Sequence, residues 1–145
     1  MPNSAIISQM NKITISTKID LPAELVWDYW TQPRHITKWA FASDDWECPK
    51  AENDLQVGGI FKTTMAAKDG SASFEIVGTY SVIEPQSLIV YKMTDGREVI
   101  TEFESLSNGV KLTQIFDPES ENSLELQRAG WQSILDNFKK YAEGN

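Results

Sequence analysis

Cysteine, long apolar runs and a signal peptide are absent or nearly absent from this 145-residue chain, and each gap excludes a class of protein. Cys48 is the single cysteine, so no disulfide bond can form within the chain, which is typical of proteins in reducing compartments. No apolar run approaches the roughly 18 residues that a membrane-spanning helix needs. The N-terminus lacks the charged start and apolar stretch of a signal peptide. We therefore expect a cytoplasmic protein that does not insert into a membrane.

Positive charge is also scarce: 13 Lys and Arg residues stand against 21 Asp and Glu residues, which gives a net charge of −8. Binding to nucleic acid requires a basic stripe that displaces the counterions of the phosphates, so we exclude a nucleic-acid partner. Gly58-Gly59 has neither the GxGxxG spacing nor a following Gly-Lys-Ser/Thr, which excludes the common nucleotide-binding loops. The sequence predicts no cofactor.

Side chains suited to catalysis or metal binding are few. His35 is the single histidine, which rules out zinc sites with two His ligands and leaves any Ser-His-Asp arrangement dependent on one residue. The adjacent acids Asp44 and Asp45 are too few for a calcium site. Glu102 and Glu104 fall on the face of a predicted strand opposite its apolar residues, as solvated side chains do. We predict no catalytic residue and no metal site, and an enzyme that uses an apolar pocket stays open as an alternative.

The first third of the chain predicts one strand and two short helices. Apolar and polar residues alternate over 12–19, which is the pattern of a half-buried strand. Pro22 is tolerated in the first turn of a helix, because its missing N–H would have no helical partner there. Pro33 ends that helix, and a second short helix carries Ile36 and Trp39.

Five further strands are predicted in the middle of the chain, after an acidic and irregular segment at 41–57 that we interpret as a long loop with a short strand near Trp46. Short turns that contain Gly, Pro or Asn, such as Asn108-Gly109, separate these strands. Strands joined so closely pair as antiparallel neighbours in a meander. The predicted strands are 60–66, 74–84, 88–93, 99–107 and 110–116.

A long helix is predicted at the C-terminus. Asn122 is the expected N-cap, with Glu125 three residues on and able to reach back. One apolar stripe follows at helical spacing, formed by Leu124, Trp131, Leu135, Phe138 and Ala142. We therefore predict an α+β fold in which this helix packs on an antiparallel sheet, with residues 12–145 as a single domain and residues 1–11 as a flexible N-terminal arm.

Large aromatic residues are more numerous than a core of this size requires, and five of them are Trp. Aromatic rings line pockets as well as fill cores, so the excess is a weak indication of a cavity. Interiors are normally close-packed, and a filled core explains the inward-facing residues at least as well. Gln114 is the exception, because a polar side chain on an apolar face needs a hydrogen-bond partner if it is buried.

Several motifs, taken together and in this order, resemble one known family. They are Pro22-Ala23-Glu24-Leu25-Val26-Trp27 with Thr31, Pro33 and Trp39 beyond it, the segments 55–61, 78–91 and 109–114, and Ala129-Gly130-Trp131 followed by Leu135 and Tyr141. This pattern resembles the activator-of-Hsp90-ATPase-like proteins, within the START/Bet v 1-like superfamily of helix-grip folds. The resemblance implies a curved antiparallel sheet of about six or seven strands wrapped on the long C-terminal helix. It also implies two short helices after the first strand, and a cavity between sheet and helix.

The resemblance places the cavity interpretation above the filled core. The function that we expect is binding of an apolar or amphipathic small molecule of lipid, polyketide or aromatic type, by a monomer or homodimer. A chaperone co-factor or other partner-binding module is an alternative, since an acidic surface can complement a basic partner. A small enzyme that uses the same cavity is another. The candidate cavity residues are Trp39, Phe61, Met65, Tyr80, Val90, Thr101, Phe103, Gln114, Phe116, Trp131, Leu135 and Phe138.

Overall fold

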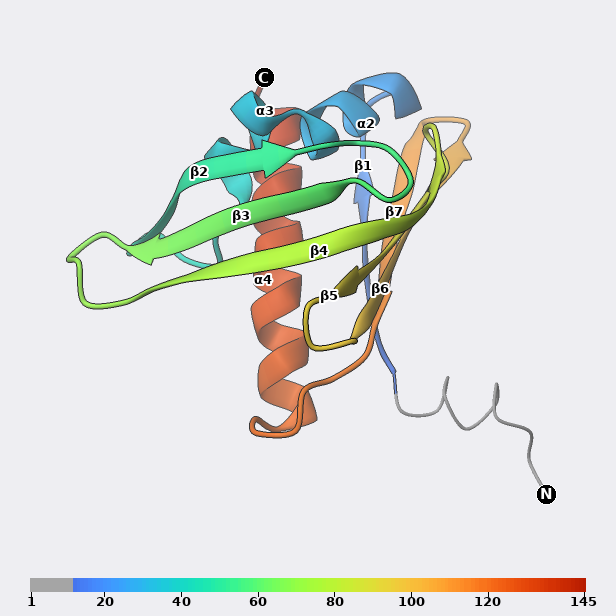
Figure 1. The fold of residues 1–145 in the computed structure, drawn as a ribbon. Coiled ribbons are helices and arrows are strands. Elements are labelled where there is room, and N and C mark those ends of the chain that lie inside the picture. The colour runs from blue at the N-terminus through green and yellow to red at the C-terminus, as the bar shows by residue number, and fades with distance from the viewer. Residues whose placement is uncertain (1–11) are drawn as a thin grey trace.

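The computed structural model describes residues 12–145, so the predicted arm at 1–11 lies outside the described residues. Seven antiparallel strands form one sheet in the order β1-β7-β6-β5-β4-β3-β2, which curves around a long helix, α4 (Figure 1). The elements are β1 (Ile13–Ile19), α2 (Ala23–Thr31), α3 (Pro33–Trp39), β2 (Trp46–Asn53), β3 (Ile60–Ala67), β4 (Ser73–Glu84), β5 (Leu88–Met93), β6 (Glu98–Leu106), β7 (Gly109–Phe116) and α4 (Leu124–Glu143). This arrangement confirms the predicted α+β helix-grip fold.

Two prolines position the short helices between β1 and β2. Pro22 is the N-cap residue of α2, and Pro33 occupies the start of α3, where its missing N–H needs no partner. Gln32 between the two helices has an extended backbone, so the chain turns there. Both helices lie near the C-terminal end of α4 (Figure 1), and the prediction of two short helices after the first strand is confirmed.

Strand β2 begins at Trp46, where a short strand is predicted, but it is longer than predicted and replaces much of the expected loop over 41–57. Its eight residues, Trp46–Asn53, pair with β3, and the register shifts between Glu47 and Lys50. Pro49 lies at this irregularity on an edge strand, where a missing N–H costs no ladder hydrogen bond. The proline and the acidic side chains break the alternation that would otherwise reveal the strand.

The start of α4 also differs from the prediction. Ser123, rather than Asn122, is the N-cap, because its hydroxyl accepts a hydrogen bond of 3.1 Å from the amide of Leu126. Leu124 is exposed, whereas Gln127 is buried and donates to the carbonyl of Asn122 at 2.8 Å. The apolar stripe of the helix therefore begins one turn later than its sequence indicates.

Side chains of α4 attach the helix to one edge of the sheet. Arg128 donates to the carbonyl of Thr14 at 2.7 Å, and Lys139 donates to the carbonyl of Lys18, both on β1. Asn137 donates to the carbonyl of Trp39 at 2.9 Å, at the end of α3. These hydrogen bonds fix the helix along β1, which is one edge strand of the sheet, and at the end of α3.

Asp117, directly after β7, closes the end of the sheet. Its carboxylate accepts hydrogen bonds from Lys12 at 2.7 Å and from the amide of Glu98 at 2.9 Å. Partial burial raises the pKa of Asp117, but these two hydrogen bonds outweigh that effect and hold the pKa below its ordinary value. A depressed folded-state pKa contributes stability above the unfolded pKa, and this contribution is lost as the pH falls through the folded pKa.

Asp117→Asn is therefore expected to lower the free energy of unfolding by about 1 kcal/mol at pH 7. The expected loss is this small because solvent screens the partly exposed carboxylate. The difference from wild type should narrow as the pH falls below about 4. Urea unfolding at several pH values measures it, with Glu104→Gln on the exposed outer face as the control. A deficit that stays constant down to pH 3 would contradict this explanation.

Candidate functional site

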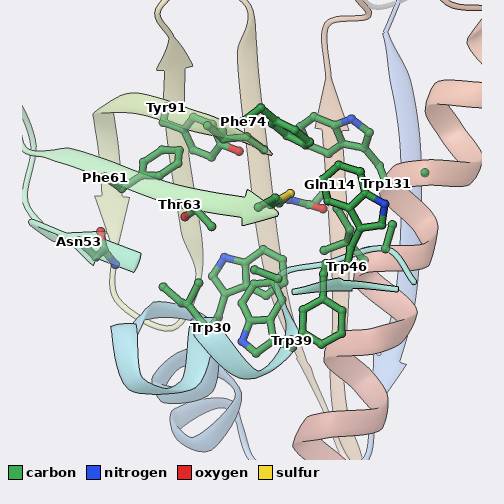
Figure 2. Close-up of a pocket in the computed structure, with 18 of the residues that line it drawn as sticks. Trp30, Trp39, Trp46, Asn53, Phe61, Thr63, Phe74, Tyr91, Gln114 and Trp131 are labelled. Atoms are coloured by element: carbon green, nitrogen blue, oxygen red, sulfur yellow. The ribbon is translucent and has the colours of Figure 1, made fainter. Parts of the chain in front are cut away.

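A cavity of about 400 Å³ lies between α4, the concave face of the sheet and the segment that joins α3 to β2 (Figure 2). Its size falls within the range of small-molecule sites in proteins. Aromatic side chains dominate its lining: Trp30, Trp39, Phe41, Trp46, Phe61, Phe74, Tyr80, Tyr91 and Trp131.

Tryptophans of α2 and α3 form the floor. The rings of Trp30 and Trp39 stack with centroids 4.6 Å apart, and the buried ring of Phe138 meets each of them edge-on at 4.9 Å. The indole N–H of Trp39 donates to the carbonyl of Tyr29 at 2.9 Å. The floor is thus fixed by packing from below and by a backbone hydrogen bond.

Three aromatic rings of β3, β4 and β5 form the sheet wall. Phe61 contacts Tyr91 edge-on, with centroids 4.5 Å apart, and lies 5.5 Å from Tyr80. Gly78 makes this arrangement possible, because a Cβ at that position would lie 2.5 Å from the Phe61 ring and 2.9 Å from the Tyr91 ring. The absence of a side chain at Gly78 lets both rings lie close against the sheet.

Three aromatic rings form the rim at the outer part of the cavity. Trp46 and Phe74 lie with centroids 5.7 Å apart, and Phe74 is 50% exposed. Trp131 of α4 completes the rim and stacks on the buried Phe116 at 3.9 Å, with an angle of 12° between the rings. Figure 2 shows Trp46, Phe74 and Trp131 grouped on the side of the space nearest α4.

One group of polar side chains in the lining is hydrogen-bonded within the protein. The hydroxyl of Tyr80 donates to the side-chain oxygen of Asn53 at 2.5 Å, and the amide of Asn53 donates to the carbonyl of Thr31 at 2.7 Å. Burial raises the pKa of the Tyr80 phenol, so this hydroxyl is neutral at physiological pH. The network connects β4 and β2 to the end of α2 and stabilises this side of the cavity.

Other polar groups in the lining keep free hydrogen-bonding capacity. The amide nitrogen of Gln114 donates to the Thr101 hydroxyl at 3.2 Å, while no protein group within residues 12–145 bonds its amide oxygen or the hydroxyl of Tyr91. Within the same residues, every fully buried polar side-chain atom has a partner. The unbonded atoms of Gln114 and Tyr91 are therefore open to the cavity, and burial raises the pKa of Tyr91 so that its phenol stays protonated.

Charge is missing from the cavity wall. In the part of the chain that the structure describes, no Asp, Glu, Lys, Arg or His lines it. The same part holds no group of three or more His, Cys, Asp or Glu residues placed to bind a metal ion. Nor does any helix between residues 12 and 145 have the length and apolar character to cross a membrane. The lining suits an uncharged molecule, because a buried charge without a partner is costly.

Six of the twelve candidate residues line the cavity: Trp39, Phe61, Met65, Tyr80, Gln114 and Trp131. The other six do not line it. Five of these are buried in the packed interior beside the cavity: Thr101, Phe103, Phe116, Leu135 and Phe138. Among them, Thr101 accepts the hydrogen bond of Gln114, and Phe116 stacks on Trp131.

Val90 lies on the face of the sheet opposite the cavity. Its neighbours Ile89 and Tyr91 both line the cavity, and successive side chains of a strand point to opposite faces. The prediction that Val90 faces the cavity is therefore wrong, because the inward residues of β5 are Ile89 and Tyr91. The same error hid Tyr91, whose alternation partner Ile89 is the signal that identifies it.

Trp46 and Asn53 are further lining residues that the sequence does not reveal, since both belong to β2, whose apolar alternation is interrupted by Pro49 and acidic residues. Trp30 and Phe74 also line the cavity. Trp30 had a usable signal, because it lies three residues after Trp27 on a predicted amphipathic helix.

Residues with possible catalytic chemistry lie outside the lining. His35 accepts or donates a hydrogen bond of 2.6 Å with the hydroxyl of Tyr141, and Glu75 is exposed and pairs with Lys62 at 3.8 Å. Cys48 is buried, and burial raises the pKa of its thiol, which disfavours the reactive thiolate. None of the three reaches the space that a ligand would occupy.

Two comparisons with known proteins agree with this architecture. The family model described as activator of Hsp90 ATPase homolog 1-like protein matches residues 20–143. A solution structure of an AHSA1-like protein from Aeromonas hydrophila is 44% identical with a TM-score of 0.87, and the match covers 92% of each chain. The solution structure of Chr148 from Cytophaga hutchinsonii is 47% identical with a TM-score of 0.81, over 93% of this chain and 94% of that one.

More distant similarity is confined to the fold. Protein CV1439 from Chromobacterium violaceum is 23% identical with a TM-score of 0.82, over 93% of this chain and 99% of that one. No curated protein matches the chain significantly. Because the family model covers nearly all of the described residues, the chain belongs to the activator of Hsp90 ATPase homolog 1-like family.

Proposed function

We propose that this protein binds an uncharged small molecule with an aromatic or otherwise apolar body in the cavity between the sheet and α4. The observation that carries the proposal is the lining itself, a cavity of about 400 Å³ walled by aromatic rings and free of charged side chains throughout the described residues. Apolar walls with a few convergent polar groups are typical of small-molecule sites. Gln114 and Tyr91 supply the polar groups that would orient a ligand.

A matched pair of fluorescent probes tests this proposal. N-phenyl-1-naphthylamine is uncharged, and 1-anilinonaphthalene-8-sulfonate has the same two ring systems with an added sulfonate. The uncharged probe should show a saturable fluorescence increase and bind at least about tenfold more tightly, because the sulfonate finds no cation in the wall and meets a net charge of −8. A saturating probe should also raise Tm.

Adjacent residues on β4 locate the binding site. Ile76 lines the cavity, whereas the next residue, Val77, points to the other face of the sheet. Ile76→Trp should weaken binding of the uncharged probe by at least about tenfold, because the larger side chain occupies part of the cavity, and Val77→Trp should leave the affinity unchanged. Absence of saturable binding to the wild type, or equal affinities for the two probes, would contradict the proposal.

The two alternative functions receive less support from the site. Acid–base catalysis needs a group in the cavity that gains or loses a proton near neutral pH, and burial raises the pKa values of both Tyr80 and Tyr91 away from that range. A chaperone co-factor needs a partner surface, and no feature of the described residues identifies one. Ligand binding is therefore the function that the geometry favours.

A further inference from the structure

Gly130 lies in the interior of α4, where the helix borders the cavity. Ile134, one turn later on the same helical face, and the adjacent Trp131 also line the cavity. A glycine inside a helix lowers stability relative to alanine, because glycine loses more backbone freedom on folding. Its presence at this position therefore needs a reason.

None of the usual structural reasons applies to Gly130. Its backbone is not in the positive-φ region that favours glycine, unlike that of Gly58 or Gly70. A Cβ at Gly130 would meet no atom within 4 Å, whereas a Cβ at Gly78 would lie 2.5 Å from the Phe61 ring. Neither backbone conformation nor packing within the protein requires the missing side chain.

We propose that the ligand packs directly on the backbone of α4 at Gly130, and that the residue at this position sets the largest ligand the cavity accepts. This inference rests on the proposed function, because it assigns the open space beside Gly130 to the ligand. A side chain at 130 would enter that space without disturbing the protein around it. Ligands that reach α4 would then be excluded, while smaller ones confined to the sheet wall would still bind.

Three variants and two uncharged probes of different size test the inference. Gly130→Ala and Gly130→Leu introduce a methyl group and a larger side chain into the cavity. Ala129→Leu is the matched control, because Ala129 is exposed and lies outside the lining. N-phenyl-1-naphthylamine serves as the large probe and indole as the small one, and circular dichroism and Tm report whether each variant folds.

Gly130→Ala should raise Tm by about 2–4 °C and lower the affinity for the large probe by roughly three- to tenfold. Gly130→Leu should lower the affinity for the large probe by more than about tenfold and change the affinity for indole by less than about threefold. A purely structural role for Gly130 would not move stability and affinity in opposite directions. The Ala129→Leu control should bind both probes as the wild type does.

Unchanged affinity of Gly130→Ala and Gly130→Leu for the large probe would overturn the inference. The inference would also be overturned if folded Gly130→Leu lost affinity equally for both probes. It would be overturned as well if Ala129→Leu lowered the affinity for the large probe as much as Gly130→Leu does. If Gly130→Leu fails to fold, the opposite shifts of Tm and affinity in Gly130→Ala decide the question. Failure of the wild type to bind either probe would instead count against the proposed function.

Discussion

Replacing Phe138 by alanine is expected to lower the free energy of unfolding by about 3–5 kcal/mol. The Phe138 side chain is completely buried on α4, and its ring meets the rings of Trp30 and Trp39 edge-on, each at 4.9 Å. Removing the ring leaves a void under the floor of the cavity, because the stacked tryptophans above it are held in place. Urea unfolding of the wild type and the variant measures the difference.

Phe74→Ala is the matched control, since it deletes the same ring at the rim of the cavity. Phe74 is 50% exposed and its ring lies 5.7 Å from that of Trp46, so the expected loss is about 1 kcal/mol or less. A large loss of stability in Phe138→Ala and a small one in Phe74→Ala would show that the interior beneath the cavity is packed, whereas the cavity itself is open. Comparable losses for the two variants would contradict this division.

Gln114→Glu is the second substitution with a large expected effect. It replaces the buried amide of Gln114 by a carboxyl group of the same shape in a wall without a cation. Burial should raise the pKa of the new carboxyl by about 2–3 units above the unfolded value of about 4.3. Stability relative to the wild type should then fall as the pH rises between the unfolded and the folded pKa.

The expected deficit of Gln114→Glu is about 1 kcal/mol at pH 5 and about 3–4 kcal/mol at pH 8. Denaturant unfolding at the two pH values measures it. Gln32→Glu is the control, because Gln32 is exposed between α2 and α3, and its effect should stay within about 0.5 kcal/mol. A deficit in Gln114→Glu that does not grow between pH 5 and pH 8 would show that residue 114 is hydrated rather than buried.

The strands and helices with regular apolar spacing were predictable from the sequence. Alternation at 12–19 located β1, and Pro22 and Pro33 located α2 and α3, because each pattern has one dominant local cause. Strand β2 was not predictable as a strand of eight residues. Its edge position tolerates Pro49 and acidic side chains, so the pairing with β3 decides its conformation rather than its own pattern.

The candidate site was predictable only in part, for a geometric reason. Period-two alternation indicates which residues face the helix, but it does not reveal how far the sheet lies from the helix at each strand. Phe61 therefore lines the cavity, whereas Phe116 is covered by Trp131 at 3.9 Å, although both face inward. The distance depends on the curvature of the sheet, which is a property of all seven strands together.

The excess of tryptophan was the most informative sequence feature. Four of the five tryptophans line the cavity: Trp30, Trp39, Trp46 and Trp131. Trp27 does not line it and packs edge-on against Phe103, with ring centroids 5.2 Å apart. The chain thus carries four reporters on the site and one internal control away from it.

The indole N–H signals of these five tryptophans in a two-dimensional ¹H–¹⁵N NMR spectrum test the central claim most directly. Titration with N-phenyl-1-naphthylamine should shift the signals of Trp30, Trp39, Trp46 and Trp131 along one saturable curve, because all four rings line the proposed site. The signal of Trp27 should move much less. Shifts confined to Trp27, or no saturable shift in any of the other four, would contradict a ligand site in this cavity.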